Sequence, residues 1–427
     1  MGRRLRIPLA YGDGSVDLRL EERNCLGILN PEPVSNVRSL GRAVREALEQ
    51  PIGCPGLAEL IGQKKAASVL VLVSDHTRVV PGYHKLLNTL FDLCLAAGVP
   101  ADKLRMLIAC GSHRPPDCDE REVLYGKRVM DLVQVYAHDC DKDCVSLGLL
   151  STGHQLAVNK LLLTSDLVIA TGKITPHYLA GFSGGRKALL PGCASRDSIA
   201  ANHAMVARLR NGPGILAGNP LHQEMDEAAD KAGIGFLVNV VPTPAGRPAG
   251  VFAGHWQKAW SEGVALCRRA WGAGFERQAD CVVASAGGHP LDINLYQLQR
   301  VLNSVAPAVR PGGTIVLVGR CREGVGQEQF GQWLKQYTVA EILAMPEEGI
   351  VSEAHRAYAT ALVLERNEVC LVSDLEPAEA ARMRFRGFGD LSLAAEYLAA
   401  KHGPDFGCYV VPKGSAVLLE ESVTSKI

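Results

Sequence analysis

The chain has 427 residues, of which 47% are hydrophobic and 21% are charged, with 45 basic and 45 acidic side chains. A chain of this length usually folds into two domains, and its composition is ordinary for a globular protein. The balanced charge disfavours nucleic acid or an anionic membrane surface as a partner, so we expect a small-molecule ligand.

The N-terminal stretch 1–18 is charged and then only briefly apolar, which is unlike a secretion signal. No apolar run reaches membrane-spanning length. The 13 cysteines are scattered without a C-x-x-C pair, as is typical of reduced thiols in a cytoplasmic enzyme. A zinc site at His138, Cys140 and Cys144 is an alternative, but the second half of a structural zinc site is missing.

Short runs of apolar, β-branched residues recur along the chain between segments with helical spacing. Such runs predict strands buried on both faces, as in parallel sheets. The predicted strands are 67–74, 104–110, 166–172, 236–242, 281–288, 314–320 and 369–373. They indicate an α/β fold of two domains, 1–272 and 273–427, with a flexible break near the WGAG stretch at 271–274.

Polar, ionisable clusters follow three of the predicted strands, at 75–78, 111–115 and 173–178. Open α/β sheets bind their ligands at the carboxyl ends of parallel strands. His113 and His177 lie in two of these clusters, and histidine suits proton transfer near neutral pH. Two such groups flanking one carbon would suit inversion of a stereocentre.

The stretch GFSGGRKALLPG (181–192) resembles a phosphate-binding loop, but Arg186 and Ala188 replace residues that a Mg²⁺-nucleotide site needs. Its glycines would still let the backbone approach a single phosphate. Downstream, Ser195 is expected to cap a helix that has Asp197 in its first turn and carries His203.

A second informative stretch runs from 285 to 313, where Asp292 is expected to cap a helix over 293–309. The residues of its predicted core stripe are Leu298, Val301, Leu302 and Val305. Gln297, Arg300 and Ser304 fall on a different face. Gln297 and Arg300 are candidates to hold a carboxylate, although a solvated helix face fits equally well. Arg78 is a further carboxylate-binding candidate.

Five stretches together resemble the lactate racemase family, whose enzymes use a nickel pincer nucleotide. They are SDHTR (74–78), GSHRP (111–115), TPHYLAGFSGGRKALLPG (175–192), NH (202–203) and GGHPLDINLYQ (287–297). They occur in order over about 220 residues. The resemblance implies two α/β domains with the active site in the cleft between them.

The resemblance also implies residue roles. Lys187 matches the lysine that is joined to the cofactor through a thioamide, and His203 matches the histidine that completes the nickel coordination. The other implied cofactor-site residues are Asp75, Thr77, Gly184 and Gly185. His113 and His177 match the paired catalytic histidines, and the implied substrate-binding residues are Arg78, Tyr296, Gln297 and Arg300. The sequence departs from the family pattern at Arg300, where the best-known member has a lysine, and at Arg186, where that member has a third small residue in the glycine loop.

The implied activity is inversion of the C2 stereocentre of a 2-hydroxy acid by hydride transfer to the nickel cofactor through a 2-keto acid. Lactate or another short aliphatic hydroxy acid is the first substrate candidate. Malate would need an additional cation, and a sugar acid such as gluconate would need more polar groups. The implied partners are the enzymes that make the cofactor. A nucleotide-dependent phosphotransferase and a binding protein without catalysis are the alternatives from other classes.

Overall fold

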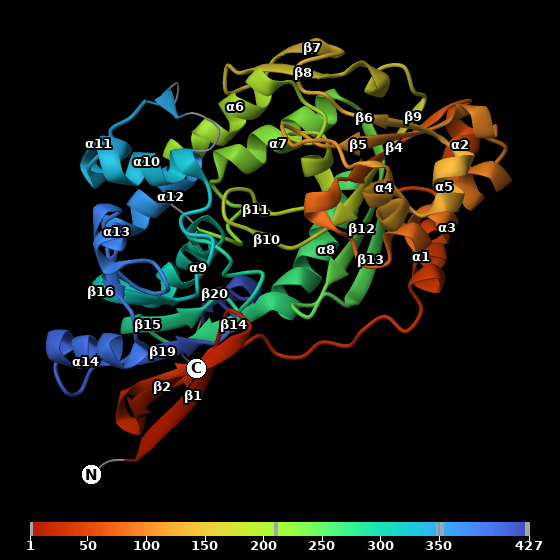
Figure 1. The fold of residues 1–427 in the computed structure, drawn as a ribbon. Coiled ribbons are helices and arrows are strands. Elements are labelled where there is room, and N and C mark those ends of the chain that lie inside the picture. The colour runs from red at the N-terminus through yellow and green to blue at the C-terminus, as the bar shows by residue number, and fades with distance from the viewer. Residues whose placement is uncertain (1–2, 209–211, 347–348, 351–353, 423–427) are drawn as a thin grey trace. The chain divides into compact units, whose positions relative to one another are not determined.

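The computed structural model describes residues 3–208, 212–346, 349–350 and 354–422. It divides into two compact units (Figure 1). The first unit consists of Pro33–Met205 and Gly214–Ala270, and the second consists of Met1–Glu32, Val206–Pro213 and Trp271–Ile427. The predicted division placed residues 1–32 with the first domain, whereas in the structure they pack with the C-terminal part of the chain.

A six-stranded sheet forms the centre of the first unit, in the order β13-β12-β9-β4-β5-β6. All neighbouring strands are parallel except β13, which pairs with β12 in an antiparallel hairpin. The strands are β4 (Val69–Ser74), β5 (Leu104–Ala109), β6 (Gln134–Ala137), β9 (Leu167–Lys173), β12 (Ile234–Pro242) and β13 (Pro248–Gly254). Consecutive residues Val69 to Val73 are all buried, which is the pattern of a strand covered on both faces.

The helices of the first unit supply the apolar faces that cover this sheet. They are α1 (Leu40–Glu49), α2 (Leu57–Lys64), α3 (Tyr83–Ala96), α4 (Cys118–Tyr125), α5 (Lys127–Leu132), α6 (Arg196–Ala204), α7 (Pro220–Lys231) and α8 (Trp256–Trp271). Helices α1 to α5 share one apolar cluster with the alternate residues Val69, Val71 and Val73 of β4. Two small hairpins complete the unit, β7 (Cys144–Leu149) with β8 (Gln155–Asn159), and β10 (Pro176–His177) with β11 (Gly181–Phe182).

A second six-stranded sheet lies in the second unit, in the order β18-β17-β16-β15-β19-β3, with every neighbouring pair parallel. Its strands are β3 (Cys25–Ile28), β15 (Ala279–Ser285), β16 (Val309–Val318), β17 (Glu368–Val372), β18 (Arg386–Phe388) and β19 (Cys408–Val411). Strands β14 (Gly272–Phe275) and β20 (Leu418–Glu421) form a separate parallel pair. The helices are α9 (Leu295–Val305), α10 (Glu328–Gln336), α11 (Val339–Leu343), α12 (His355–Leu364), α13 (Pro377–Arg382) and α14 (Leu391–His402).

The N-terminal segment belongs to this second unit for a physical reason. β1 (Arg4–Tyr11) and β2 (Gly14–Glu21) form a hairpin whose apolar residues pack into the core of the second sheet, with α14 beside it (Figure 1). β3 then adds to the edge of the sheet by pairing with β19. Alternating apolar residues such as Ile7, Leu9, Leu18 and Leu20 are buried here, which is the signal of a hairpin with one covered face.

The seven predicted strands are present, and the predicted α/β fold with largely parallel sheets is confirmed. The predicted core stripe of α9 is also confirmed, because Leu298, Val301, Leu302 and Val305 are fully buried. The predicted cap of this helix is wrong. Asn294 is the N-cap and accepts from the N–H of Gln297, whereas Asp292 is buried and accepts from the N–H groups of Gly12 and Arg320.

In the described part of the chain, no helix combines the length and the apolar character that crossing a membrane requires.

Candidate active site

Asp75 and His113 come together from the ends of two neighbouring parallel strands, β4 and β5. The Asp75 carboxylate is buried and lies 2.7 Å from Nδ1 of His113. It also accepts from the N–H of Thr77 at 3.2 Å and from its hydroxyl at 2.8 Å. Burial pushes the pKa of Asp75 up, but hydrogen bonding from His113, the charge of Arg78 and the bond from Thr77 outweigh it, so the pKa is lowered overall. The carboxylate is therefore ionised and acts only as an acceptor.

Arg78 lies against this pair. Its Nη1 atom is 3.7 Å from Oδ1 of Asp75 and 3.5 Å from Nδ1 of His113. The residue occupies the short 3₁₀ turn η2 (His76–Arg78), for which Asp75 is the N-cap. A guanidinium that is 39% exposed in this position retains donors for an incoming anion.

The loop that carries His113 is fixed at both ends. Gly111 has φ +57° and donates its N–H to the carbonyl of Gly192, while the N–H of His113 donates to the carbonyl of Cys110. The left-handed conformation of Gly111 is one that side-chain-bearing residues rarely adopt. The His113 loop is thus tied directly to the end of the glycine-containing stretch.

His177 lies in the β10–β11 hairpin, and both of its ring nitrogens have partners. Nδ1 accepts from the backbone N–H groups of Leu179 and Ala180, each at 3.2 Å. Nε2 is 3.3 Å from Nζ of Lys187. The imidazole also stacks on Tyr178, with ring centroids 5.2 Å apart.

Lys187 is buried, with 8% of its surface exposed, in the 3₁₀ turn η5 (Gly185–Ala188). Burial lowers its pKa well below the ordinary value, and the charges of Arg78 and Arg186 lower the pKa further. The pKa of His177 is also lowered well below its ordinary value, by burial and then by Lys187, Arg78 and His203. Lys187 and His177 are thus direct neighbours, and the charges of Arg78 and Arg186 lower the pKa of both.

Arg186 has a role that the sequence did not reveal. The side chain of Arg186 is fully buried. Its Nη1 and Nη2 donate to the carbonyls of Phe182 and Ala180 at 3.2 and 3.0 Å, and its Nε lies 3.1 Å from Asp226. Its guanidinium stacks on Trp260 at 3.9 Å from the ring centroid. Arg186 therefore stabilises the β10–β11 hairpin, which carries His177.

The glycines of this stretch pack against protein. A Cβ on Gly184 would lie 2.5 Å from the side-chain oxygen of Asn239, and one on Gly185 would lie 2.8 Å from Trp260. The N–H of Gly185 donates to Asn239 at 2.8 Å. This N–H group is satisfied within the protein, so close packing explains both glycines. Their predicted contact with a cofactor phosphate stays a prediction.

His203 lies in the last turn of α6, whose predicted cap is confirmed, since Ser195 accepts from the N–H of Ser198 and Asp197 is in the first turn. The preceding residue, Asn202, is fully buried and donates to Glu224 at 2.9 Å. Glu224 also lies 2.7 Å from Nδ1 of His154. Glu224 thus ties the helix of His203 to the β7–β8 region.

Three residues that hold this region together, Asn239, Trp260 and Glu224, were not among the predicted site residues. Glu224 had a usable signal, because it falls in the apolar stripe of α7 with Leu221, Met225 and Ala228. A carboxylate at a core position needs partners, and such residues are often structural anchors. Asn239 and Trp260 lie in ordinary strand and helix patterns, where no local signal distinguishes them.

The remaining predicted site residues belong to the second unit, on α9. Gln297 and Arg300 are partly buried neighbours, and Nε of Arg300 lies 3.4 Å from the carbonyl of Gln297. Tyr296 packs edge-on against Phe330, and the guanidinium of Arg356 stacks on its ring at 3.8 Å. Arg356 also donates to the carbonyl of Tyr296 at 2.7 Å.

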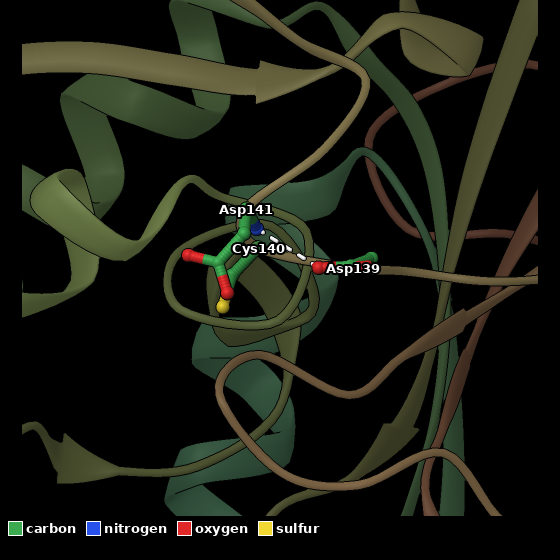
Figure 2. A group of neighbouring side chains, drawn as sticks. All are labelled: Asp139, Cys140 and Asp141. Atoms are coloured by element: carbon green, nitrogen blue, oxygen red, sulfur yellow. Dashed lines mark hydrogen bonds between the residues drawn. The ribbon is translucent and has the colours of Figure 1, made fainter.

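The zinc alternative finds no support in the structure. The ring nitrogens of His138 are engaged, with Nε2 2.9 Å from the carbonyl of Ala194 and Nδ1 3.2 Å from the amide of Asn159. In the described residues, the group of metal-type ligands with closely spaced donor atoms is instead Asp139, Cys140 and Asp141 (Figure 2).

This group is also explained without a metal ion. The N–H of Asp141 donates to Asp139 at 3.0 Å, as the dashed line in Figure 2 shows. Arg196 contacts both carboxylate oxygens of Asp141 at 2.7 Å, and Lys142 pairs with Asp139 at 3.2 Å. The carboxylates are thus neutralised by neighbouring cations at the protein surface.

Two family models match the chain. The lactate racemase N-terminal domain matches residues 11–213, and the lactate racemase C-terminal domain matches residues 275–419. The lactate racemase of Thermoanaerobacterium thermosaccharolyticum is 32% identical to this chain, and that of Lactiplantibacillus plantarum is 30% identical. Each alignment covers 97% of this chain and 99% of the relative.

Solved structures agree. The apoprotein structure of the lactate racemase from T. thermosaccharolyticum has a TM-score of 0.90 and 31% identity, and the match covers 98% of this chain and 100% of that one. A Thermotoga maritima protein of 18% identity has a TM-score of 0.62 over 92% of this chain and 100% of its own, which shows the fold alone. Because family models match both parts of the sequence and the relatives align over nearly its full length, the chain belongs to the lactate racemase family and is an enzyme, a racemase of the isomerase class.

Proposed function

We propose that this racemase inverts the C2 stereocentre of a 2-hydroxy acid, with lactate or another short aliphatic hydroxy acid as its substrate. The observation that carries the proposal is the pairing of side chains that follow the strands, with Asp75–His113 beside Arg78 and His177 beside Lys187. It combines acid–base groups, an anion-binding cation and a buried amine.

His113 is the group best prepared to remove a hydroxyl proton. Its Nδ1 faces the buried carboxylate of Asp75 at 2.7 Å, which fixes the ring and stabilises the imidazolium that forms when Nε2 takes up a proton. Arg78 is proposed to hold the substrate carboxylate, because guanidinium groups bind carboxylates with two parallel donors. Tyr296, Gln297 and Arg300 are proposed as further substrate-binding residues, as the family resemblance implies.

A nickel pincer nucleotide is proposed as the cofactor, with Lys187 as its attachment point and His203 as a nickel ligand. The donor set fits such a group. Burial lowers the pKa of Lys187 and so favours its neutral amine, the form that is acylated, and the positive charge of Arg78 favours an anionic group at this site. When bound, this group would supply the hydride chemistry at the substrate C2. Asp75, Thr77, Gly184 and Gly185 are proposed to lie near it.

The proposal also concerns the cellular setting. The 13 cysteines are all free, which supports a reducing compartment such as the cytoplasm. The cofactor-synthesis enzymes are proposed as the partners that supply the nickel group.

Intact-mass measurement tests the cofactor assignment. The chain co-expressed with cofactor-synthesis enzymes should gain a nucleotide-sized adduct that maps to Lys187, with about one nickel per chain. The Lys187→Ala variant should lack the adduct. His203→Ala should keep the adduct but lose most of the nickel. Wild-type chain without adduct and without nickel under these conditions would contradict the cofactor assignment.

Loss of optical purity tests the reaction. The loaded enzyme should racemise lactate in heavy water without incorporating deuterium at C2, because the hydride returns internally. Deuterium at the inverted carbon would contradict hydride return. Malate and gluconate belong in the same screen, since either would give the same chemistry on a larger substrate.

A further inference from the structure

Glu224 is a buried carboxylate that the proposed reaction does not use. It lies on α7 with 1% of its surface exposed, and a carboxylate in such a position needs hydrogen-bond partners in place of water. Its Oε2 accepts from the hydroxyl of Thr152 and lies 2.7 Å from Nδ1 of His154, both in the turn between β7 and β8. Its Oε1 accepts from Nδ2 of Asn202 on α6 at 2.9 Å. One side chain therefore joins three separate segments of the first unit.

The amide of Asn202 depends on this carboxylate. Asn202 is fully buried. Its Nδ2 donates to Glu224 and lies 3.5 Å from the carbonyl of Leu221, while its Oδ1 has no hydrogen-bond partner among the described residues. A carboxylate oxygen accepts from an amide only through the NH₂ group, so Glu224 also fixes which way the amide faces. Without Glu224, the buried amide would keep only a long contact to a carbonyl.

Asn202 lies in the last turn of α6, where a helix is held least well. This helix has nine residues, Arg196–Ala204, and the carbonyl groups of a last turn lack partners within the helix. The first turn of α6 is fixed to β8, since the hydroxyl of Ser198 donates to the carbonyl of Gln155 at 2.8 Å. The bond from Asn202 to Glu224 supplies a side-chain attachment at the other end.

His203 follows Asn202 directly, and consecutive side chains leave a helix about 100° apart. A rotation or displacement of the last turn that moves Asn202 therefore also moves His203. We propose that Glu224 is a positioning residue for the metal ligand, and that it holds the last turn of α6 so that His203 presents its imidazole to the nickel cofactor. The proposal rests on the proposed function, in which His203 is that ligand. Glu224 acts through Asn202 and takes no part in proton transfer.

Four variants separate this role from a general contribution to stability. Glu224→Leu removes both acceptor oxygens, and Asn202→Ala removes the amide but leaves the carboxylate bonded to the β7–β8 turn. Glu224→Gln keeps an oxygen that can accept from Asn202. Glu227→Leu is the matched control, because Glu227 also lies on α7 and accepts from the N–H and the hydroxyl of Ser151 in the same turn. Among the described residues, none of its hydrogen bonds goes to α6.

Loss of nickel to a chelator measures the metal site. Chains co-expressed with the cofactor-synthesis enzymes are exposed to EDTA below the Tm of each variant, and nickel is counted per adduct-bearing chain. Glu224→Leu and Asn202→Ala should lose nickel about tenfold faster than the wild type, the lower end of the effect of groups that orient metal ligands. Glu224→Gln should lie close to the wild type, and Glu227→Leu should match it. Wild-type rates in both Glu224→Leu and Asn202→Ala would overturn the proposal.

The double variant Glu224→Leu with Asn202→Ala tests whether the two residues act through one bond. It should lose nickel no faster than the faster single variant, because both changes remove the same contact. Multiplied rates would overturn the proposal, since Glu224 would then act on the metal by another route. If Glu224→Leu did not fold, Asn202→Ala would carry the chelator measurement, because it leaves the buried carboxylate bonded to Thr152 and His154.

Hydrogen exchange of the unloaded chain tests the helix without the cofactor. The amides at the end of α6 should exchange faster in Glu224→Leu and Asn202→Ala than in the wild type and Glu227→Leu, because the last turn has lost its attachment. Unchanged exchange would overturn the proposal, and so would faster exchange with nickel retained as in the wild type. A wild-type chain that gains no nickel would contradict the proposed function, and the exchange result would still decide whether Glu224 holds α6.

Discussion

Oδ2 of Asp75 lies 2.7 Å from Nδ1 of His113. The carboxylate is fully buried, and it orients an imidazole that is 39% exposed. We predict that Asp75→Ala lowers kcat by about 10²–10⁴-fold, because the ring loses its orientation and the imidazolium loses its counter-charge. The kcat of Asp75→Asn should fall between those of Asp75→Ala and the wild type. The measurement is kcat with saturating lactate, per chain bearing the adduct.

Asp166→Asn is the matched control for this prediction. Asp166 accepts from the N–H groups of Ala67 and Ser68 and from the Ser68 hydroxyl, so these bonds hold a backbone turn and not a histidine ring. Its replacement should leave kcat unchanged. If Asp75→Ala retained wild-type kcat, the carboxylate would have no part in holding His113.

Much of this arrangement could be predicted from sequence. Asp75, His113 and His177 follow buried strands, and parallel topology brings the ends of β4, β5 and β9 to one edge of the sheet. The strands could be predicted because strands buried on both faces appear in the sequence as continuous runs of apolar residues. The N-cap of α9 was misplaced because Asp292 and Asn294 both have capping side chains, and only tertiary contacts from Gly12 and Arg320 to Asp292 decide between them.

Other features depend on long-range contacts that local sequence does not encode. The burial of Arg186 requires Asp226 and Trp260, which lie 40 and more residues further along the chain. The placement of residues 1–32 depends on pairing between β3 and β19, at opposite ends of the sequence. The hydrogen bonds to Nδ1 of His177 depend on the path of the backbone through Leu179 and Ala180.

Buried His138 predicts a pH dependence of stability. Burial lowers its pKa below the ordinary 6.5, against the opposing effects of the Ala194 carbonyl and Asp139. Below 6.5 the unfolded chain therefore binds the proton more readily than the folded chain. The stabilisation is fully present above that value and is lost as pH falls toward the folded pKa. We expect a lower Tm at about pH 5.5 than at about pH 7.5.

The variant His138→Gln isolates this contribution. Glutamine can donate to the Ala194 carbonyl and accept from Asn159 as the neutral imidazole does, but it does not titrate. The fall in Tm between the two pH values should be smaller in the variant than in the wild type. His177, whose pKa is also lowered, contributes a loss of the same sign in both proteins. An unchanged fall in the variant would show that His138 does not supply it.

Arg186 is predicted to contribute strongly to stability. Arg186→Met should lower the free energy of unfolding by about 3–5 kcal/mol, because it removes the cation paired with Asp226 and leaves two carbonyl groups without their donor. Arg186→Lys keeps the positive charge but loses the planar set of guanidinium N–H donors. Its free energy of unfolding should therefore lie between those of Arg186→Met and the wild type. The double variant Arg186→Met with Asp226→Asn should recover part of the loss, since it leaves no unpaired carboxylate. Chemical denaturation measures each value.

Arg196→Met is the control for this prediction. Arg196 also contacts an aspartate through two nitrogens, each at 2.7 Å, but both side chains are more than half exposed. Surface ion pairs contribute little to stability, so the free energy of unfolding should change only slightly. Similar losses in the Arg196 and Arg186 single variants would mean that burial of Arg186 has no energetic consequence.

Gly185 is predicted to be required by packing and backbone conformation. Its φ is +54°, and a Cβ would lie 2.8 Å from Cδ1 of Trp260. Gly185→Ala should therefore cost about 1–2 kcal/mol for the left-handed backbone and about 1–3 kcal/mol more for the clash. Gly148 separates the two effects, because its φ is +85° and a Cβ at this position would have no neighbouring atom of the described residues within 4 Å. Gly148→Ala should show only the backbone cost, so the difference between the variants measures the contact with Trp260. Equal costs in chemical denaturation would show that Trp260 moves aside freely, and the close packing of the glycine stretch would then not explain why residue 185 is glycine.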